Sequence, residues 1–385
     1  MKPSALDLAL TYLLRIAQIM KVAILLPTWV GDTCMATPTI RSLRDGLPEV
    51  EELCAVGRYA PIAVLEGAPW IDSTLTFKPR SRDSKILSRR GLVSKLKSRG
   101  FDMIVLLPNS LSSGMIAYFS GAKRRVGYAK DGRTWLLTDP ISQREDEVDH
   151  RKRPTIDYYL RIADHLGCRS DDRAMKLFVS DLDREMARNL YSQFQFSWEN
   201  PTVVFNTSSA SAAARLWPVG YASRAARQLA DRHGIQVIVH CGPSDRDRAN
   251  AIAFGASHPL VMSMGQIQDI PIGLSKAVLE QANVVLSTDS GPRHIAVALN
   301  NKVVSLFGPT DPNNTQTYNQ PETILRVPMD CQPCGKSKCP LVHNNCMHGL
   351  NYSVAVQAVL EQLNLTLDGQ AVRPASSCAL PRRAA

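Results

Sequence analysis

Short apolar runs recur along the chain, and segments of helical length separate them. In the first half these runs are KVAILLP (21–27), ELCAVG (52–57) and MIVLLP (103–108). In the second half they are TVVFN (202–206), QVIVHCG (236–242), VVLSTD (284–289) and KVVSLFGP (302–309). Continuous Val, Ile and Leu runs that alternate with helices are typical of parallel strands buried on both faces. The pattern therefore predicts an α/β fold.

The same rhythm occurs in both halves, which indicates two domains. A chain of 385 residues is also too long for one ordinary core and suits two. We expect two Rossmann-like, doubly wound domains facing an interdomain cleft, over residues 21–197 and 198–365. Residues 1–20 are interpreted as an N-terminal extension or a short amphipathic helix. The Ala-, Pro- and Arg-rich residues 366–385 are expected to form a disordered tail.

Charge and composition narrow the class of protein. The formal net charge is +10, and residues 78–99 alone contain nine Lys or Arg and one acid, Asp83. Such a segment favours phosphate-rich partners or anionic surfaces, although a solvated amphipathic helix would explain it as well. No run of eighteen apolar residues occurs, which excludes a membrane-spanning helix. Aromatic residues make up only 6%, and no nucleic-acid-binding module is recognisable, so we expect no nucleic-acid partner.

Polar loops follow several of the predicted strands, at the sheet edge where α/β proteins bind ligands. After the first strand, Gly31 permits a tight turn and Asp32 begins a helix. Asp32 could simply be a helix N-cap, or it could take a proton from a hydroxyl at the mouth of the cleft. As an N-cap, this carboxylate would have a lowered pKa and be ionised.

Two loops of the second half suit a diphosphate. Ser287–His294 (STDSGPRH) joins a strand to a helix whose free N–H groups and dipole favour an anion. The other loop carries hydroxyls at 207–209 and then Arg215, which can bind phosphate oxygens in a bidentate manner. A further turn, with Gly242, Ser244 and Asp245, could contact a ribose or a base, although Gly-Pro turns are common.

Four cysteines gather in one short stretch, at Cys331, Cys334, Cys339 and Cys346. Their spacing could hold a structural zinc ion, form disulfides or remain as reduced thiols. The other five cysteines are scattered, as is typical of a cytosolic protein.

Taken in order, the stretches PTWVGDT, LLPNSLSSGMIAYFSGAKRRVGY, STDSGPRHIAVAL and VVSLFGPTDP resemble the lipopolysaccharide heptosyltransferases of glycosyltransferase family 9, especially the type II members. The resemblance covers roughly residues 20–365. It implies a GT-B fold, an ADP-heptose donor, inversion at the anomeric carbon and transfer without a metal cofactor. It also implies an anionic acceptor in the inner core of lipopolysaccharide, and a cytoplasmic enzyme that is peripheral on the inner leaflet of the inner membrane.

The resemblance also implies roles for individual residues. Asp32 matches the catalytic general base, and the first domain would bind the acceptor. The donor-binding residues implied in the second domain are Thr207, Ser208, Ser209, Arg215 (where the family usually has Lys), Asp289, Ser290, Gly291 and His294. The acceptor-binding residues implied in the first domain are Asn109, Ser110, Arg124 and Arg125.

Three other functions remain open at this point. A transferase of another nucleotide sugar to a cell-envelope glycan would use the same loops. A nucleotide-sugar epimerase would leave residues 109–125 and the basic segment without a role. A non-enzymatic protein could use its basic residues to hold anionic lipid or nucleic acid.

Overall fold

The computed structural model describes residues 20–47, 50–78, 88–142, 153–207, 212–318 and 320–365. The expected N-terminal extension, apart from Met20, and the expected tail at 366–385 lie outside the described residues. Ser208, Ser209 and the 79–87 part of the basic segment lie outside them as well.

Within the described residues, six parallel strands form the first sheet in the order β3-β2-β1-β4-β5-β6. These strands are β1 (Met20–Leu25), β2 (Val50–Gly57), β3 (Ser73–Thr76), β4 (Met103–Leu106), β5 (Arg124–Tyr128) and β6 (Asp139–Ile141). The strand order reverses between β1 and β4, so the loops after these two strands border the crevice where doubly wound sheets bind ligands.

The second sheet repeats this arrangement with the order β12-β11-β10-β7-β8-β9, again with all described strands parallel. Its strands are β7 (Thr202–Asn206), β8 (Gln236–Val239), β9 (Val261–Ser263), β10 (Val284–Thr288), β11 (Val303–Phe307) and β12 (Glu322–Arg326). Here the order reverses between β7 and β10. The two sheets confirm the expected pair of doubly wound α/β units.

Each predicted strand is present, and the described residues form five further strands that the apolar pattern did not predict: β3, β5, β6, β9 and β12. These strands have three to five residues each, and none contains a long Val/Ile/Leu run. Short strands toward the edges of a sheet are held by pairing with an inner neighbour, so their own sequence carries little signal.

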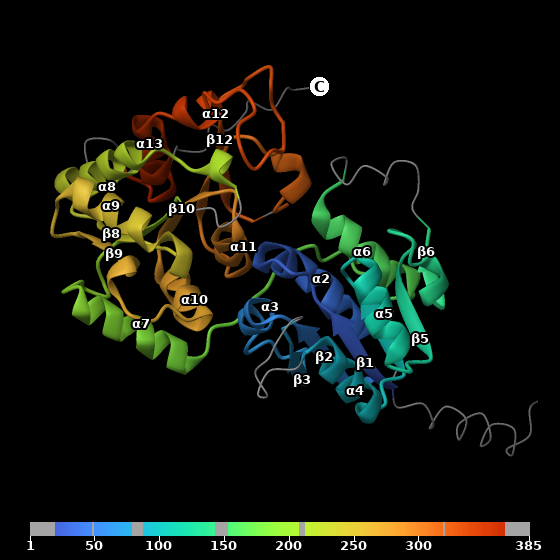
Figure 1. The fold of residues 1–385 in the computed structure, drawn as a ribbon. Coiled ribbons are helices and arrows are strands. Elements are labelled where there is room, and N and C mark those ends of the chain that lie inside the picture. The colour runs from blue at the N-terminus through green and yellow to red at the C-terminus, as the bar shows by residue number, and fades with distance from the viewer. Residues whose placement is uncertain are drawn as a thin grey trace, which may run out of the picture.

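Helices cover both faces of each sheet (Figure 1). In the first domain they are α2 (Val30–Gly46), α3 (Tyr59–Val64), α4 (Arg89–Arg99), α5 (Leu111–Phe119) and α6 (Thr155–His165). Helices α2, α3 and α6 form the layer next to the second domain, where α2 packs on α11 (Gly291–Ala298) and α3 on α10 (Ile272–Gln281). Helices α4 and α5 cover the other face over a separate apolar core, which includes Leu92 and Ile116. The α4–α5 layer therefore faces away from the second domain.

Residues before the predicted boundary at 197 already contact the second domain. Leu177 donates its N–H to the carbonyl of Ala298 in the second domain, at 3.0 Å. Helix α7 (Asp181–Gln193) then packs on α10, where Arg184 pairs with Glu280 at 2.8 Å. The buried Lys276 of α10 makes a second contact between the second domain and the preceding chain. Its ammonium donates to the carbonyls of Glu66 and Phe178 at 2.9 and 2.7 Å.

The remaining helices lie in the second domain: α8 (Val219–His233), α9 (Arg246–Ala256), α12 (Asn345–His348) and α13 (Tyr352–Gln362). No helix in the described part of the chain has both the length and the apolar character needed to cross a bilayer.

Candidate active site

The loop after β1 leads directly into α2, and Asp32 is the third residue of that helix. Trp29 is the N-cap residue, and its side chain makes no capping hydrogen bond. The interpretation of Asp32 as an N-cap is therefore wrong. The Asp32 carboxylate therefore does not cap the start of α2 and can bind another group at the edge of the first domain.

The loop after β10 carries Asp289 and Ser290 and leads into α11, which begins at Gly291. Ser290 is the N-cap residue, but its hydroxyl makes no capping bond to the helix. That hydroxyl instead donates to the carbonyl of Thr288 at 3.2 Å and accepts from the Asn206 amide at 2.8 Å. Asn206 ends β7, so it ties together the two loops that border the crevice of the second domain. The first N–H groups of α11 are thus not used by a side-chain cap, as an anion site requires.

The starts of α2 and α11 are in direct contact across the domain boundary. A Cβ atom added at Gly31 would lie only 2.8 Å from the ring of His294, so only glycine fits there. A Cβ at Gly291 would similarly be 3.7 Å from the Cβ of Val30. The structure therefore brings Asp32 of the first domain to the loop that carries Asp289, Ser290, Gly291 and His294.

Burial is the largest influence on the pKa of Asp32. Removal from water raises its pKa from 3.8 to about 6, an effect that the Arg215 cation opposes and the Asp289 carboxylate reinforces. The lowered pKa expected for an N-cap is therefore wrong, because desolvation outweighs the lowering effect of the Arg215 cation. A carboxylate with a pKa near 6 is mostly ionised at neutral pH, and it accepts a proton more readily than an ordinary aspartate does.

The two titratable groups opposite Asp32, Asp289 and His294, behave differently. Burial alone would raise the pKa of Asp289, but the neighbouring cations, with Arg293 the strongest, lower it overall. Asp289 is therefore ionised at neutral pH. Burial, together with the neighbouring Arg293 cation, lowers the pKa of His294 to about 4, so this imidazole is neutral at pH 7. Of these three groups, Asp32 is the one that titrates between pH 5 and 7.

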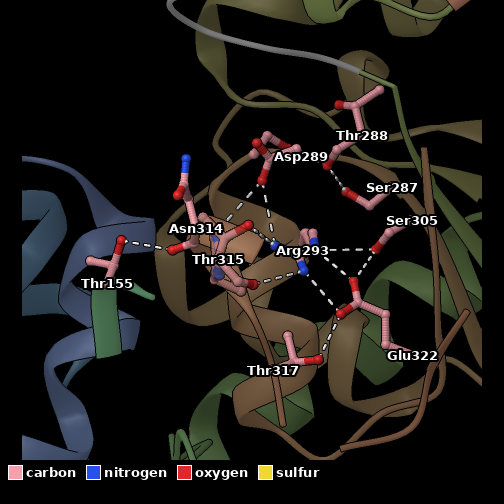
Figure 2. A network of polar contacts seen from close by, with 12 residues as sticks. Thr155, Ser287, Thr288, Asp289, Arg293, Ser305, Asn314, Thr315, Thr317 and Glu322 are labelled. Carbon is pink, nitrogen blue, oxygen red and sulfur yellow. Dashed lines mark hydrogen bonds and ion pairs between the residues drawn. The ribbon is translucent and has the colours of Figure 1, made fainter. Parts of the chain in front are cut away.

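A fully buried arginine holds the Asp289 loop in place, and the sequence patterns did not reveal it. Arg293 binds Glu322 of β12 in a bidentate manner, with N–O distances of 2.6 and 2.9 Å (Figure 2). It also donates to Ser305 and to both oxygens of Thr315, each at 3.1 Å, and lies 3.4 Å from a carboxylate oxygen of Asp289. The network anchors α11, β11, β12 and the preceding turn to one side chain. Its acid, Glu322, lies 29 residues farther along in an unpredicted edge strand, which is why no local signal pointed to the pair.

Two polar side chains of the second domain have unused hydrogen-bonding capacity. Arg215 belongs to the 3₁₀ helix η4 (Ala213–Arg215) and donates through Nη1 to the carbonyl of Asp289 at 2.9 Å, while its Nε has no partner in the described part of the chain. The Thr207 hydroxyl, directly after β7, is buried and likewise has no partner among the described residues. A buried polar atom without a partner is costly, so such atoms are candidates for binding a polar ligand.

The turn with Gly242, Ser244 and Asp245 follows β8 and forms the 3₁₀ helix η5 (Pro243–Asp245). Because β8 pairs with β7, this turn lies at the same edge of the second sheet as Thr207. The Ser244 hydroxyl lies 3.4 Å from the Asp245 carboxylate.

Another buried arginine, Arg133, anchors the loop that follows β4. Arg133 donates to the Asn109 side-chain oxygen at 3.3 Å and to the hydroxyl of Ser113 at 2.8 Å. The amide of Asn109 donates in turn to the Tyr158 hydroxyl at 2.7 Å. Ser110 caps α5 by accepting the N–H of Ser113. Arg133 and Tyr158 were missed because their partners are remote in sequence. Asn109 and Ser110 thus lie at the carboxyl edge of the sheet, like the loop before Asp32.

Arg124 and Arg125 lie at the opposite edge of the first sheet from Asn109 and Ser110. They are the first residues of β5, and Arg124 pairs in register with Met103, the first residue of β4. They therefore lie at the amino edge of the sheet, opposite Asn109. Arg124 pairs with Asp139 at 2.6 Å, and Arg125 donates to the carbonyls of Leu136 and Ala122 at 2.8 and 2.7 Å. This placement does not support the acceptor-binding role that the resemblance implied for them.

The cysteine-rich stretch contacts two loops of the second domain. Ser337 accepts the N–H of Ala214 at 3.0 Å, next to Arg215, and Gly335 donates to the carbonyl of Pro309 in the loop after β11 at 2.8 Å. Cys331, Cys334, Cys339 and Cys346 are all free thiols. No three His, Cys, Asp or Glu side chains of the described residues are arranged to hold a metal ion. This arrangement does not support the structural zinc ion that the spacing suggested, and zinc stays a prediction.

Two facing Rossmann-like domains, with the Asp32 carboxylate on one and the start of α11 on the other, have the architecture of the GT-B glycosyltransferases. The family model for glycosyltransferase family 9 (heptosyltransferase) matches residues 89–344, and the chain belongs to this family.

Individual relatives agree with this assignment. The chain is 24% identical over 355 residues to lipopolysaccharide heptosyltransferase 2 of Escherichia coli, covering 90% of this chain and 99% of that protein. Among solved structures, the family 9 glycosyltransferase of Veillonella parvula has a TM-score of 0.75 at 19% identity, covering 89% of this chain and 97% of that one. The E. coli ADP-heptose LPS heptosyltransferase II has a TM-score of 0.73 at 21% identity, with 89% and 98% covered. The structural likeness concerns the fold.

Proposed function

We propose that this enzyme transfers heptose from ADP-heptose to a hydroxyl of the lipopolysaccharide inner core, with inversion at the anomeric carbon. The close approach of Gly31 to His294 carries the proposal, because it holds the Asp32 carboxylate of one domain against the Asp289–His294 loop of the other. Membership of the heptosyltransferase family supports heptose as the transferred sugar.

The second domain would bind the donor. The diphosphate would lie at the start of α11, where N–H groups and the helix dipole favour an anion. The unused Nε of Arg215 and the unpartnered hydroxyl of Thr207 would bind phosphate oxygens. The ionised Asp289 holds Arg215 nearby, at 3.9 Å between Nη1 and a carboxylate oxygen. The turn with Gly242, Ser244 and Asp245 is proposed to meet the nucleoside.

Transfer would be a single displacement. The acceptor oxygen forms a bond to the anomeric carbon while its proton passes to the Asp32 carboxylate. The bond from that carbon to the phosphate oxygen breaks, and its electrons leave with ADP. Arg215 and the start of α11 would stabilise the charge that develops on the leaving diphosphate. Asn109 and Ser110 are proposed to orient the acceptor.

The test uses the whole protein and purified substrates. We expect ADP-heptose to raise the melting temperature more than UDP, GDP or CMP sugars do, since a ligand at a hundred times its Kd stabilises the folded state by about 2.7 kcal/mol. With a core acceptor that lacks this heptose, the products should be ADP and a glycan one heptose longer, also in the presence of EDTA. Turnover of the donor without an acceptor would indicate an epimerase, and a stronger response to another nucleotide sugar would contradict the proposed donor.

The pH dependence of kcat/KM is a separate prediction. Asp32 must be ionised to act as a base, and burial raises its pKa to about 6. The rate should therefore fall roughly tenfold for each pH unit below about 6, where an ordinary aspartate would hold it constant down to about pH 4. A rate that stays flat between pH 7 and 4.5 would remove Asp32 as the base.

The acceptor is anionic and lipid-linked under this proposal, which gives the basic segment a role. Of that segment, Lys78 and residues 88–99 are described, and α4 contains no acid among its residues (Arg89–Arg99). We propose a cytoplasmic enzyme that binds peripherally to the inner leaflet through this side of the first domain.

A further inference from the structure

Helix α5 has an exposed apolar stripe. Leu111, Met115, Tyr118 and Phe119 are 43%, 41%, 46% and 59% exposed. Their spacing places them on one side of the helix, while Ser113, Gly114, Ile116 and Ala117 are buried on the other. A surface helix normally turns its apolar side toward the core, so this second apolar side is available to a partner.

The stripe continues beyond the helix. Trp135, in the 3₁₀ helix η1 (Thr134–Leu136), is 70% exposed. Its ring lies 6.2 Å from Tyr118, which in turn lies 5.3 Å from Phe119. Arg125 packs over the Tyr118 ring at 5.5 Å. Three exposed aromatic rings thus form one cluster at the end of α5.

Beside the stripe lies a strongly basic helix. Helix α4 packs next to α5, and its Arg89, Arg90, Lys95 and Lys97 are exposed. No ion pair joins any of these four to an acid within the described part of the chain. The surface formed by these four cations, the α5 stripe and Trp135 is called the α4–α5 surface below.

The position of the α4–α5 surface suits an enzyme working at a flat boundary. Both helices lie on the face of the first sheet that points away from the second domain (Figure 1). At its other end, α5 begins directly after Asn109 and Ser110, at the edge of the candidate active site. A flat partner on this surface would leave the domain boundary free while lying close to the acceptor loop.

We infer that the α4–α5 surface binds an anionic lipid bilayer, with the aromatic cluster in the headgroup region and the α4 cations over acidic headgroups. Tyr and Trp favour this region because they are apolar with a polar edge, and Lys and Arg are attracted to anionic lipid. A second copy of the chain fits less well, because a symmetric contact through this surface would bring two sets of unpaired cations together. The inference rests on the proposed function in so far as a lipid-linked acceptor is what such an enzyme would meet there.

The experiment is sedimentation of the full-length protein with vesicles of phosphatidylcholine alone or mixed with phosphatidylglycerol, without donor or acceptor. We expect binding to the mixed vesicles that weakens with added salt. The variant Tyr118→Ser/Phe119→Ser/Trp135→Ser should bind at least tenfold more weakly. Its control is Phe254→Ser, which removes an aromatic ring that is 87% exposed on α9 of the second domain.

A second pair of variants separates local charge from net charge. Arg90→Ala/Lys95→Ala/Lys97→Ala should weaken binding on the order of a hundredfold. Arg224→Ala/Arg227→Ala/Arg232→Ala removes the same charge from exposed positions of α8 and should have little effect.

Several outcomes would overturn the inference. One is an aromatic variant that binds vesicles as tightly as the wild-type protein does. Another is an equal loss of vesicle binding in both charge variants. A third is a dimer of the wild-type protein that only the aromatic substitutions abolish. Transfer to a lipid-free acceptor should be unchanged in all these variants. A wild-type protein that binds vesicles but transfers no heptose would contradict the proposed function and still support membrane binding by the α4–α5 surface. A wild-type protein that transfers heptose but does not bind vesicles would support the proposed function and contradict membrane binding.

Discussion

Asp32→Asn is expected to lower kcat by about 10²–10⁴-fold, because asparagine has nearly the shape of aspartate but cannot take the proton of the acceptor hydroxyl. Donor binding should persist, since the start of α11, Arg215 and Thr207 are unchanged. The melting temperature should stay the same or rise, because the substitution removes an ionised group whose burial raises its pKa to about 6. Steady-state kinetics and a thermal melt with and without ADP-heptose measure the three quantities.

The matched control is Asp45→Asn, which makes the same chemical change at an exposed position of the same helix. It should leave kcat within about twofold, since exposed substitutions have small effects. If Asp32→Asn kept near-normal transfer while the protein remained folded, the base would have to be another residue and the mechanism would fail.

Arg293→Met is expected to destabilise the protein by about 3–5 kcal/mol, because it leaves Glu322 as a buried charge without its cation. The side chains of both residues are at most 3% exposed, so water cannot replace the lost hydrogen bonds. Transfer should also fall, since Arg293 touches the Asp289 carboxylate and holds the loop that begins α11 (Figure 2). Urea unfolding, followed by a probe in the second domain, measures the change in stability.

Two further variants show whether the loss of stability in Arg293→Met comes from the unpaired buried charge. Arg227→Met removes one partner of an exposed pair, Arg227 with Asp231 at 3.2 Å, and should have an effect below about 1 kcal/mol. Adding Glu322→Gln to Arg293→Met should restore much of the stability, because the buried charge is then gone. No recovery in the double variant would mean that packing of Arg293, including its contact with the Phe307 ring at 4.8 Å, matters more than its charge.

The sequence alone was sufficient to predict the fold class and the loops that form the candidate active site. Seven apolar runs predicted seven inner strands, because a strand buried on both faces needs apolar side chains at nearly every position. The carboxyl ends of those strands then located Asp32, Asn109, Thr207 and Asp289, since parallel strands present their ends at one edge of a sheet. These features depend on local pattern and on general rules of connection, which a sequence displays directly.

Only the tertiary structure decided how the residues behave. Arg124 and Arg125 are motif neighbours of Asn109 but lie at the opposite edge of the sheet, because β5 is held by pairing with β4. The partnership of Arg293 with Glu322 joins residues that no local pattern connects. The pKa of Asp32 rises where its place in the first turn of a helix would lower it. Burial and the sum of nearby charges set such properties, and both depend on which distant parts of the chain come together in space.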